Sequence, residues 1–521
     1  MASFTFTDNL GYITDFGLRL LPDKTALLQH DRSLTYAELD ERANRVAHAV
    51  LDAGAGKGDR VLMLFENDVR FAECMLGIIR AGAVAVPVNP RLGPVRHEDL
   101  LVDCQARVVI GSAGLADTVA TLVGKGLCEL GIAVGASSPT LRDYESWLAA
   151  SSPERPDVVC ALDDVCLQPY TSGSTGMPKG VLLTHRGMLR DARLMAQGVM
   201  LDVDDRVLVS TPLFHMNAAA CGLLPCLASG ASVAVLPVFE PKAVIGAVAQ
   251  YRATYTTGVP AMYKMVLAER EALREHDLSS LRFIACGSAP MPEPLLAELE
   301  EVFPGIQVLE GYGLTECGPV ATIVPRWGIK KRGSIGLALP GFEMRVVGDQ
   351  GQDVGVDEVG ELWMRSECMC VGYHNRPDAT AERFRPDGWL STGDLVRRDA
   401  EGWFFFMGRA DDMLSVGGEN VYPAEVEALL TQHPDVRDVA VVPRPHELKG
   451  EVPVAFVVLS HGATATAREL QDFFLARGPA HAHPRDVFFL DAMPLSGTGK
   501  TNRQELVCRA EKLQHHQPTP A

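Results

Sequence analysis

The sequence predicts an α/β protein with a large N-terminal domain of layered βαβ units and a small α+β C-terminal domain. Three observations support this prediction. The chain has 521 residues, which is more than a single hydrophobic core usually serves. Apolar strand-like runs alternate with helical segments as far as about residue 408. Shorter strands and helices follow, so the domains are predicted at residues 1–408 and 409–521.

The first βαβ unit is predicted between residues 34 and 88. Thr35 and Glu38 have the spacing of a capping box, which marks the start of a helix. One face of that helix is apolar and contains Leu39, Ala43, Val46, Ala47 and Val50. Apolar runs at 60–65 and 83–88 suit strands buried on both faces, with a helix ending near Ile78 between them.

Similar strand-like runs recur along the chain. In the large domain they lie at 165–168, 207–212, 232–237, 283–287 and 307–313. Beyond residue 408 they lie at 436–442, 452–459 and 486–490, together with a helix that Thr466 and Glu469 would cap. The polar stretch 408–412 can add little to either core, so the domain boundary is predicted there.

Composition narrows the class of protein. The chain has 66 acidic and 48 basic residues and a net charge of -18, which argues against nucleic acid or an anionic membrane as the main partner. Its twelve cysteines are scattered, and we expect free thiols, with Cys368 and Cys370 packed in a core rather than bound to a metal. The N-terminus lacks the pattern of a signal peptide, and no run reaches about 18 apolar residues. We expect a cytoplasmic enzyme without a membrane span.

Two lysine-bearing loops indicate phosphate chemistry. The segment YTSGSTGMPKG, residues 170–180, can direct backbone N–H groups and hydroxyls at phosphate oxygens while Lys179 supplies positive charge. It is not a Walker A loop, because Pro178 precedes the lysine and Gly180 follows it. Lys500 lies on a second glycine-flanked turn, where it either reaches anionic oxygens or is an ordinary surface lysine.

Seven ordered blocks resemble the adenylate-forming superfamily, which includes acyl- and aryl-CoA synthetases, firefly-type luciferases and nonribosomal peptide adenylation domains. They are YTSGSTGMPKG at Tyr170, PLFHMNA at Pro212, GSAP at Gly287, EGYGLTE at Glu310, STGDL at Ser391, GRADDMLSVGGENVYPAEVE at Gly408 and SGTGK at Ser496. The resemblance covers essentially the whole chain and is closest to the acyl-CoA synthetases. It implies ATP-dependent conversion of a carboxylic acid to an acyl-AMP, with pyrophosphate release and Mg²⁺ as cofactor, and then transfer to CoA.

The resemblance also assigns the ATP site. The phosphate loop would comprise Thr171, Ser172, Gly173, Ser174, Thr175, Gly176 and Lys179, and the adenine slot Gly287, Ser288, Ala289, Gly311 and Tyr312. Asp394 matches the ligand of the ribose hydroxyls, and Arg409 lies beside the ribose and phosphate. The catalytic set would be Thr315 on the α-phosphate, Glu316 on magnesium, Lys500 on the substrate carboxylate, and His215 where acid and thiol meet.

The second half-reaction would use the small domain, which is mobile in the family. Rotation about Asp411 would withdraw Lys500 and bring Gly417, Gly418, Glu419 and Asn420 to the pantetheine. Two departures from the family pattern concern the nucleotide end of CoA. The segment HAHPR at 481–485 lacks the aromatic residue and lysine that many relatives have there, and no tryptophan stands near Lys449.

By position in the family, the acyl pocket would involve His215, Asn217, Ala218, Gly258 and Cys286. The run from 214 to 222 is mostly small and contains no charge, so a second carboxylate or an ammonium group would lack a partner. We therefore expect a monocarboxylic acid with an apolar tail that can be bulky. The alternative is that these small residues only pack a helix against the sheet.

The expected partners are the acid, ATP and CoA. Two alternatives for the second step stay open: a carrier-protein phosphopantetheine in place of CoA, and luciferase-like oxygenation of the adenylate. A homodimer is compatible with the sequence, and a nucleic-acid partner is not expected.

Overall fold

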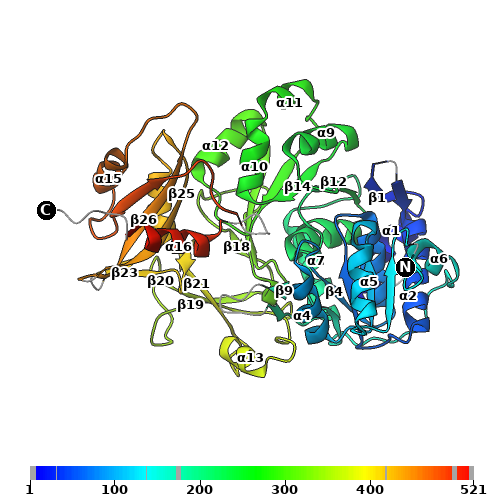
Figure 1. Ribbon diagram of the computed structural model, residues 1–521. Coiled ribbons are helices and arrows are strands. Elements are labelled where there is room, and N and C mark those ends of the chain that lie inside the picture. Colours follow the sequence, from blue (N-terminus) through cyan, green and yellow to red (C-terminus); the bar gives the residue numbers. More distant parts are fainter. Residues whose placement is uncertain are drawn as a thin grey trace.

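The computed structural model describes residues 8–30, 32–136, 138–171, 178–416, 419–446, 448–495 and 501–514. Figure 1 shows sheets covered by helices in the N-terminal part and a separate group of strands in the C-terminal part. The predicted α/β class, with a large N-terminal and a smaller C-terminal part, is confirmed. No helix among the described residues is long and apolar enough to cross a membrane.

The first predicted βαβ unit belongs to a sheet whose described strands run in the order β11-β8-β4-β3-β5-β6-β7. The strands are β3 (Arg60–Leu64), β4 (Val84–Pro87), β5 (Val108–Gly111), β6 (Leu130–Ala133), β7 (Arg142–Asp143), β8 (Val165–Leu167) and β11 (Leu183–Thr184). The helices are α2 (Tyr36–Asp52), α3 (Val69–Arg80), α4 (Pro94–Cys104), α5 (Ala116–Gly124) and α6 (Tyr144–Ala149). The predicted capping box starts α2: the Glu38 N–H donates to Thr35 Oγ1 at 3.2 Å, and the Thr35 N–H to Glu38 Oε2 at 2.8 Å.

A second sheet leads to the site, and its order within the described residues is β18-β17-β16-β15-β14-β12-β13-β1-β2. The strands are β1 (Thr25–Gln29), β2 (Arg32–Thr35), β12 (Arg206–Val209), β13 (Ser232–Val235), β14 (Tyr255–Gly258), β15 (Phe283–Cys286), β16 (Gln307–Tyr312), β17 (Thr322–Ile323) and β18 (Leu337–Ala338). The helices are α1 (Asp15–Leu20), α7 (His185–Gly198), the π-helix η3 (Ala218–Leu223), α8 (Leu224–Ala228), α9 (Pro241–Tyr251), α10 (Pro260–Ala268), α11 (Arg270–Glu275) and α12 (Glu293–Val302). Because β12, β14, β15 and β16 are parallel, their carboxyl ends share one edge.

Several strands end before the predicted residue, and the largest such difference is in β12. A strand was expected at 207–212, and β12 ends earlier, at residue 209. The Asn67 side chain explains the difference, because its Nδ2 donates to the carbonyl of Thr211 at 2.9 Å and its Oδ1 accepts the N–H of Leu213 at 2.8 Å. Pro212, between them, has no N–H to give to a neighbouring strand.

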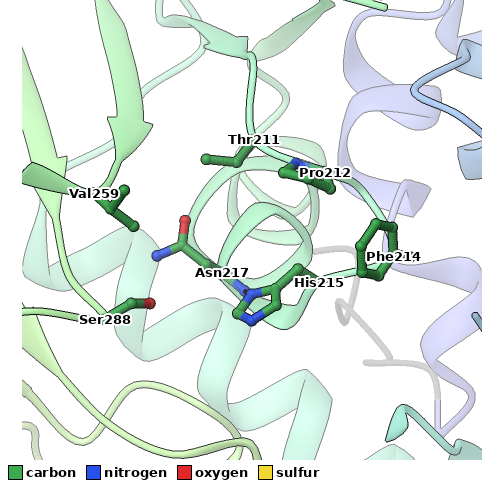
Figure 2. A pocket seen from close by; sticks show the side chains of 7 residues that line it. All are labelled: Thr211, Pro212, Phe214, His215, Asn217, Val259 and Ser288. Atoms are coloured by element: carbon green, nitrogen blue, oxygen red, sulfur yellow. Dashed lines mark hydrogen bonds between the residues drawn. The ribbon is translucent and has the colours of Figure 1, made fainter. Parts of the chain in front are cut away.

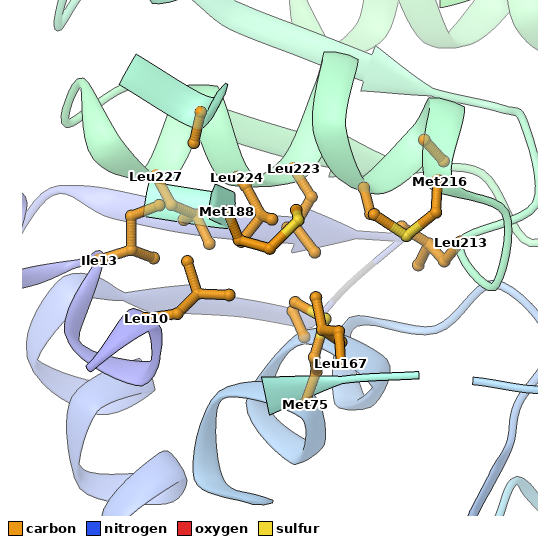
Figure 3. Packing of buried hydrophobic residues seen from close by; sticks show 14 of the residues in the cluster. Leu10, Ile13, Met75, Leu167, Met188, Leu213, Met216, Leu223, Leu224 and Leu227 are labelled. Atoms are coloured by element: carbon orange, nitrogen blue, oxygen red, sulfur yellow. The ribbon is translucent and has the colours of Figure 1, made fainter. Parts of the chain in front are cut away.

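A hydrophobic core fills the space between the two sheets. Its side chains come from η1 (Leu10–Tyr12), α3, β8, α7, η3 and α8, and Figure 3 shows them around Leu167, Met188 and Leu224. A Cβ on Gly77 of α3 would lie 2.4 Å from Val46 of α2, so these helices pack through bare backbone. The strands that lead to the site therefore rest on a closely packed support.

Residues beyond 340 form two smaller sheets. The first contains β19 (Glu343–Val347), β20 (Val359–Arg365), β21 (Leu390–Arg398) and β22 (Phe404–Arg409). The helix α13 (Pro377–Arg383) lies between β20 and β21 in the chain. The other contains β23 (Leu414–Val416), β24 (Glu419–Val421), β25 (Val436–His446), β26 (Gly450–Leu459) and β27 (Asp486–Phe489), with α14 (Pro423–Leu430), α15 (Ala467–Leu475) and α16 (Arg503–Gln514). This last sheet has hydrophobic clusters of its own. Gly408 and Arg409 pair with Leu395 and Asp394, so the chain between the two sheets starts within the predicted boundary stretch, at residue 410.

Candidate active site

Predicted site residues of the large domain gather at the carboxyl ends of parallel strands. Gly258, Cys286 and Tyr312 are the last residues of β14, β15 and β16, and Gly258 pairs with Cys286. Ligands of open α/β sheets usually bind outside this edge. The GSAP block follows β15 directly, and the EGYGLTE block spans the end of β16.

Tyr312, Asp394 and Arg409 meet although they are far apart in the chain, and we call them the ribose group. The Tyr312 hydroxyl donates to Asp394 Oδ2 at 2.5 Å, and Arg409 Nη1 lies 3.2 Å from Asp394 Oδ1. Burial raises the pKa of the Asp394 carboxyl above its usual value, although the Arg409 cation opposes this rise. Arg409 Nε also donates to Asp411 Oδ1 at 3.0 Å, so the predicted hinge residue adjoins the ribose group.

The GSAP and EGYG segments lie directly against each other. A Cβ on Gly287 would come within 3.1 Å of the carbonyl oxygen of Gly311, so a side chain there would push the two segments apart. Ser288 has a φ of +66°, in the left-handed region that serine rarely adopts, and both Ser288 and Ala289 are exposed. The predicted adenine residues therefore form an accessible surface of small residues next to Tyr312.

Lys179, Glu316 and Tyr373 form a second polar cluster, which we call the phosphate-side cluster. The Tyr373 hydroxyl donates to Glu316 Oε1 at 2.7 Å, and the Lys179 ammonium lies 5.2 Å from the centre of the Tyr373 ring. Glu316 follows Thr315 in the short helix η4 (Thr315–Cys317), and its carbonyl accepts the N–H of Cys370 at 2.8 Å. Sequence reasoning misses Tyr373, because a lone tyrosine in a loop has no spacing that marks it.

Lys179 is held by a short pair of strands. β10 (Lys179–Gly180) runs antiparallel to β9 (Tyr170–Thr171), with Lys179 opposite Thr171. The other predicted phosphate-loop residues, Ser172, Gly173, Ser174, Thr175 and Gly176, lie outside the described residues, as do Gly417, Gly418 and Lys500. Glu419 and Asn420 are exposed at the start of β24.

A small cavity of about 20 Å³ lies beside the adenine residues (Figure 2). Its lining comprises Thr211, Pro212, Phe214, His215, Asn217, Val259 and Ser288. Thr257 orients Asn217, because its Oγ1 donates to Asn217 Oδ1 at 3.1 Å, and the Asn217 N–H donates to His215 Nδ1 at 3.3 Å. The volume suits about one water molecule, so a bulky acid can enter only if neighbouring side chains move.

Three predicted pocket residues do not line this cavity. Ala218, Gly258 and Cys286 are buried, and none of them is among the residues that line the cavity. The Cys286 thiol packs in a cluster with Tyr263 and Met291, between β15 and the helices α10 and α12. Ala218 begins η3, a π-helical turn of a kind that is frequent at functional sites. A contact of these three residues with the acid stays a prediction.

Comparisons with known proteins identify the family to which the chain is similar. The family model of AMP-binding enzymes matches residues 18–374, and the model of the AMP-binding enzyme C-terminal domain matches residues 425–500. The chain is 38% identical to a feruloyl-CoA synthase of Amycolatopsis sp., over 94% of this chain and 96% of that protein. It is 34% identical to an indoleacetate–CoA ligase of Aromatoleum aromaticum, over 94% and 95% of the two chains. An anthranilate CoA ligase, solved in complex with anthranoyl-AMP, superposes with a TM-score of 0.91 at 29% identity, covering 98% of both chains.

Proposed function

Since the chain belongs to the AMP-binding enzyme family, we propose that it activates an aromatic or similarly apolar monocarboxylic acid. It is an AMP-forming acid–thiol ligase, and its relatives make CoA thioesters. ATP, CoA and a small carboxylic acid are its substrates. CoA is favoured over a carrier protein as acceptor, because these relatives are CoA ligases.

The observation that supports adenylation most directly is the arrangement of two sets of side chains, the ribose group and the phosphate-side cluster. The two groups are joined through the EGYGLTE block, because Tyr312 belongs to one and Glu316 to the other. ATP can then lie with its adenine and ribose at Tyr312 and its phosphates at Glu316 and Lys179. This arrangement supports a nucleotide that is held at both ends and attacked in between.

In the proposed first step, a carboxylate oxygen attacks the α-phosphorus, a carboxyl–phosphate bond forms, and the bond to pyrophosphate breaks. Two anions approach each other, so positive charge is the main requirement at the site. We assign Lys179 to the β- and γ-phosphates, and Lys500 to the α-phosphate and the carboxylate. Neither side chain forms a covalent bond, so the chain supplies position and charge.

Mg²⁺ fits the residues of the phosphate-side cluster. Glu316 offers a carboxylate that is 9% exposed, with one oxygen bound to Tyr373, and Thr315 offers an adjacent hydroxyl. The described residues contain no group of three or more His, Cys, Asp or Glu side chains that could hold a metal ion, so the remaining ligands would be phosphate oxygens and water. When bound there, Mg²⁺ would supply positive charge beside the phosphate oxygens.

Two observations support an aromatic acid. His215 is the one ionisable side chain among the residues that line the cavity, and Phe214, Pro212 and Val259 supply apolar surface. A second charge on the acid would therefore be buried without a partner. The relatives and the solved neighbour described above act, by their names, on feruloyl, indoleacetate and anthranilate groups.

For the second step we propose domain alternation. The small domain, 409–521, would turn about Asp411, which lies in the exposed chain between β22 and β23. This turn would replace Lys500 with the segment 417–419, and the CoA thiol would attack the acyl carbon as AMP leaves.

The twelve cysteines are free, which supports our proposal of a cytoplasmic location. Light scattering would test whether the enzyme is a homodimer.

The proposal is tested by ATP-dependent pyrophosphate release across a panel of aromatic, aliphatic and dicarboxylic acids, with and without CoA. Mass analysis should identify AMP and an aryl-CoA thioester. Formation of AMP and pyrophosphate without any thioester would contradict CoA as acceptor, and a phosphopantetheinylated carrier protein would then be tried. Formation of ADP and phosphate would contradict adenylation itself.

A further inference from the structure

Asp191, on α7, has an unusual environment for a carboxyl group. The side chain is fully buried, and its Oδ1 accepts the N–H of Val320 at 3.2 Å. Its Oδ2 is also buried and has no hydrogen-bond partner among the described residues. The neighbouring Arg190 does not neutralise it, because Arg190 forms an ion pair with Glu367 at 2.9 Å. A buried carboxyl with one unpaired oxygen is costly and needs an explanation.

The protonation of Asp191 follows from this environment. Burial raises the pKa of the Asp191 carboxyl well above its usual range, and the Val320 N–H only partly opposes that rise. This environment favours the neutral carboxylic acid, which has an O–H to donate as well as an oxygen that accepts. A partner that both donates and accepts would satisfy it.

The position of Asp191 relates it to the acyl region. Helix α7, which carries Asp191, packs against η3, and Asp191 accepts the N–H of Val320. Burial, and after it the Asp191 carboxyl, raises the pKa of the Cys221 thiol. Cys221 belongs to η3, which starts directly after Asn217 of the cavity lining. Asp191 therefore lies on a helix that packs against η3, the element that directly follows the cavity lining.

We propose that Asp191 is a specificity-determining residue, whose Oδ2 hydrogen-bonds a polar ring substituent of the bound acid, either a hydroxyl or an amine. The acid would lie along η3, with its carboxylate near His215 and its substituent at Asp191. An unsubstituted ring would leave the carboxyl unpaired, and a site with an unpaired buried polar group discriminates strongly against such a substrate. This inference rests on the aromatic acid class proposed above.

The test compares kcat/KM for CoA thioester formation within pairs of acids. Cinnamic and benzoic acids are each paired with their 3- and 4-hydroxylated analogues. The wild-type enzyme should prefer one hydroxylated analogue by about 10-fold or more. Asp191→Asn, which can still donate and accept, should keep most of this preference, and Asp191→Leu should reduce it to about 1.

A matched control is Asp205→Asn. Asp205 is as buried as Asp191, but it directly precedes β12 and is paired with Thr254 and Arg282. This variant should lower the thermal midpoint without changing the preference for hydroxylated acids. The comparison separates a loss of stability from a loss of recognition.

Three outcomes decide the inference. Thioester formation by the wild type without any preference for a hydroxylated acid would overturn it and needs no variant. A preference that survives in Asp191→Leu would overturn it too, and in both cases the proposed function would stand. If the wild type makes no thioester from any of these acids, the aromatic substrate class fails and the inference fails with it.

Discussion

At the scale of single residues, Tyr373 has the clearest testable role, because its hydroxyl orients the carboxylate that we assign to magnesium. Tyr373→Phe removes the donor to Glu316 and keeps the ring beneath Lys179. Loss of such a supporting contact typically costs about 10- to 100-fold in metal affinity or activity. We therefore expect ATP–pyrophosphate exchange to need at least about 10-fold more Mg²⁺.

The control for Tyr373→Phe is Tyr251→Phe, which removes a remote hydroxyl that accepts the N–H of His30. This variant should leave the Mg²⁺ dependence of exchange unchanged. A Tyr373→Phe enzyme with the wild-type Mg²⁺ requirement would show that Tyr373 has no part in positioning Glu316.

His185 links stability to pH. Burial lowers the pKa of this histidine to about 4, and its Nδ1 accepts the N–H of Leu10 at 3.0 Å. In the unfolded chain its pKa is about 6.5, so the unfolded state binds more protons between these values. The contribution of His185 to stability is therefore complete above pH 6.5 and falls by about 3 kcal/mol as the pH drops to 4.

The measurement is the thermal midpoint at pH 7.5 and at pH 5. In His185→Gln, the drop in midpoint between these pH values should be smaller than in the wild type, because glutamine does not titrate. His461→Gln changes an exposed histidine and should behave as the wild type does. Equal pH sensitivity of His185→Gln and the wild type would assign the acid loss to other groups.

At the scale of elements, the segment between α15 and β27 presents a basic group in place of the residues that many relatives have. The Gln471 side chain donates to the carbonyls of Pro484 and Arg485 at 3.0 and 2.9 Å, which fixes the segment, and Arg485 Nη1 lies 3.3 Å from His483 Nε2. Burial lowers the pKa of His483, and the hydrogen bond to Ala480 opposes this change. The cations of Arg485 and Lys449 also lower this pKa, so the segment carries a basic cluster.

We predict that this cluster contacts the phosphates at the nucleotide end of CoA. Arg485→Ala should raise the KM for CoA by about 3- to 10-fold, since about 1.4 kcal/mol corresponds to a factor of ten. ATP–pyrophosphate exchange should not change. The control is Arg477→Ala, which removes an arginine that lies over Phe473 in the same domain. An unchanged KM for CoA in Arg485→Ala would place the nucleotide elsewhere.

At the scale of the whole molecule, the two parts of the chain have separate hydrophobic clusters, and few polar contacts join them among the residues that the structure describes. Lys264 of α10 lies 3.9 Å from the Asp438 carboxylate of β25 and donates to the carbonyl of Arg437. Such half-exposed contacts contribute about 1 kcal/mol or less each, so they can break when the small domain turns.

If the small domain does turn, the two half-reactions depend on different faces of it. Lys500→Ala should reduce adenylation by about 100-fold or more and leave thioester formation from supplied acyl-AMP within about 3-fold of the wild type. The two rates are measured separately, by pyrophosphate release and by acyl-CoA formation. Equal loss of both rates would contradict domain alternation.

Much of the fold follows from local patterns. The capping boxes at Thr35 and Thr466 are present, and the five apolar residues predicted on one face of α2 are buried. The order of the seven blocks was sufficient to identify the family. Local patterns suffice here, because helix caps and apolar periodicity depend on residues that are close in the chain.

The contacts of the site are different in kind. The pair of Tyr312 and Asp394 spans 82 residues, and the pair of Tyr373 and Glu316 spans 57. The chain alone therefore establishes the fold class and the family and predicts the reacting groups, because these depend on residue type and order. The roles of Tyr373 and Asp191 depend on which distant segments pack together, and only the folded chain creates those distances and that burial.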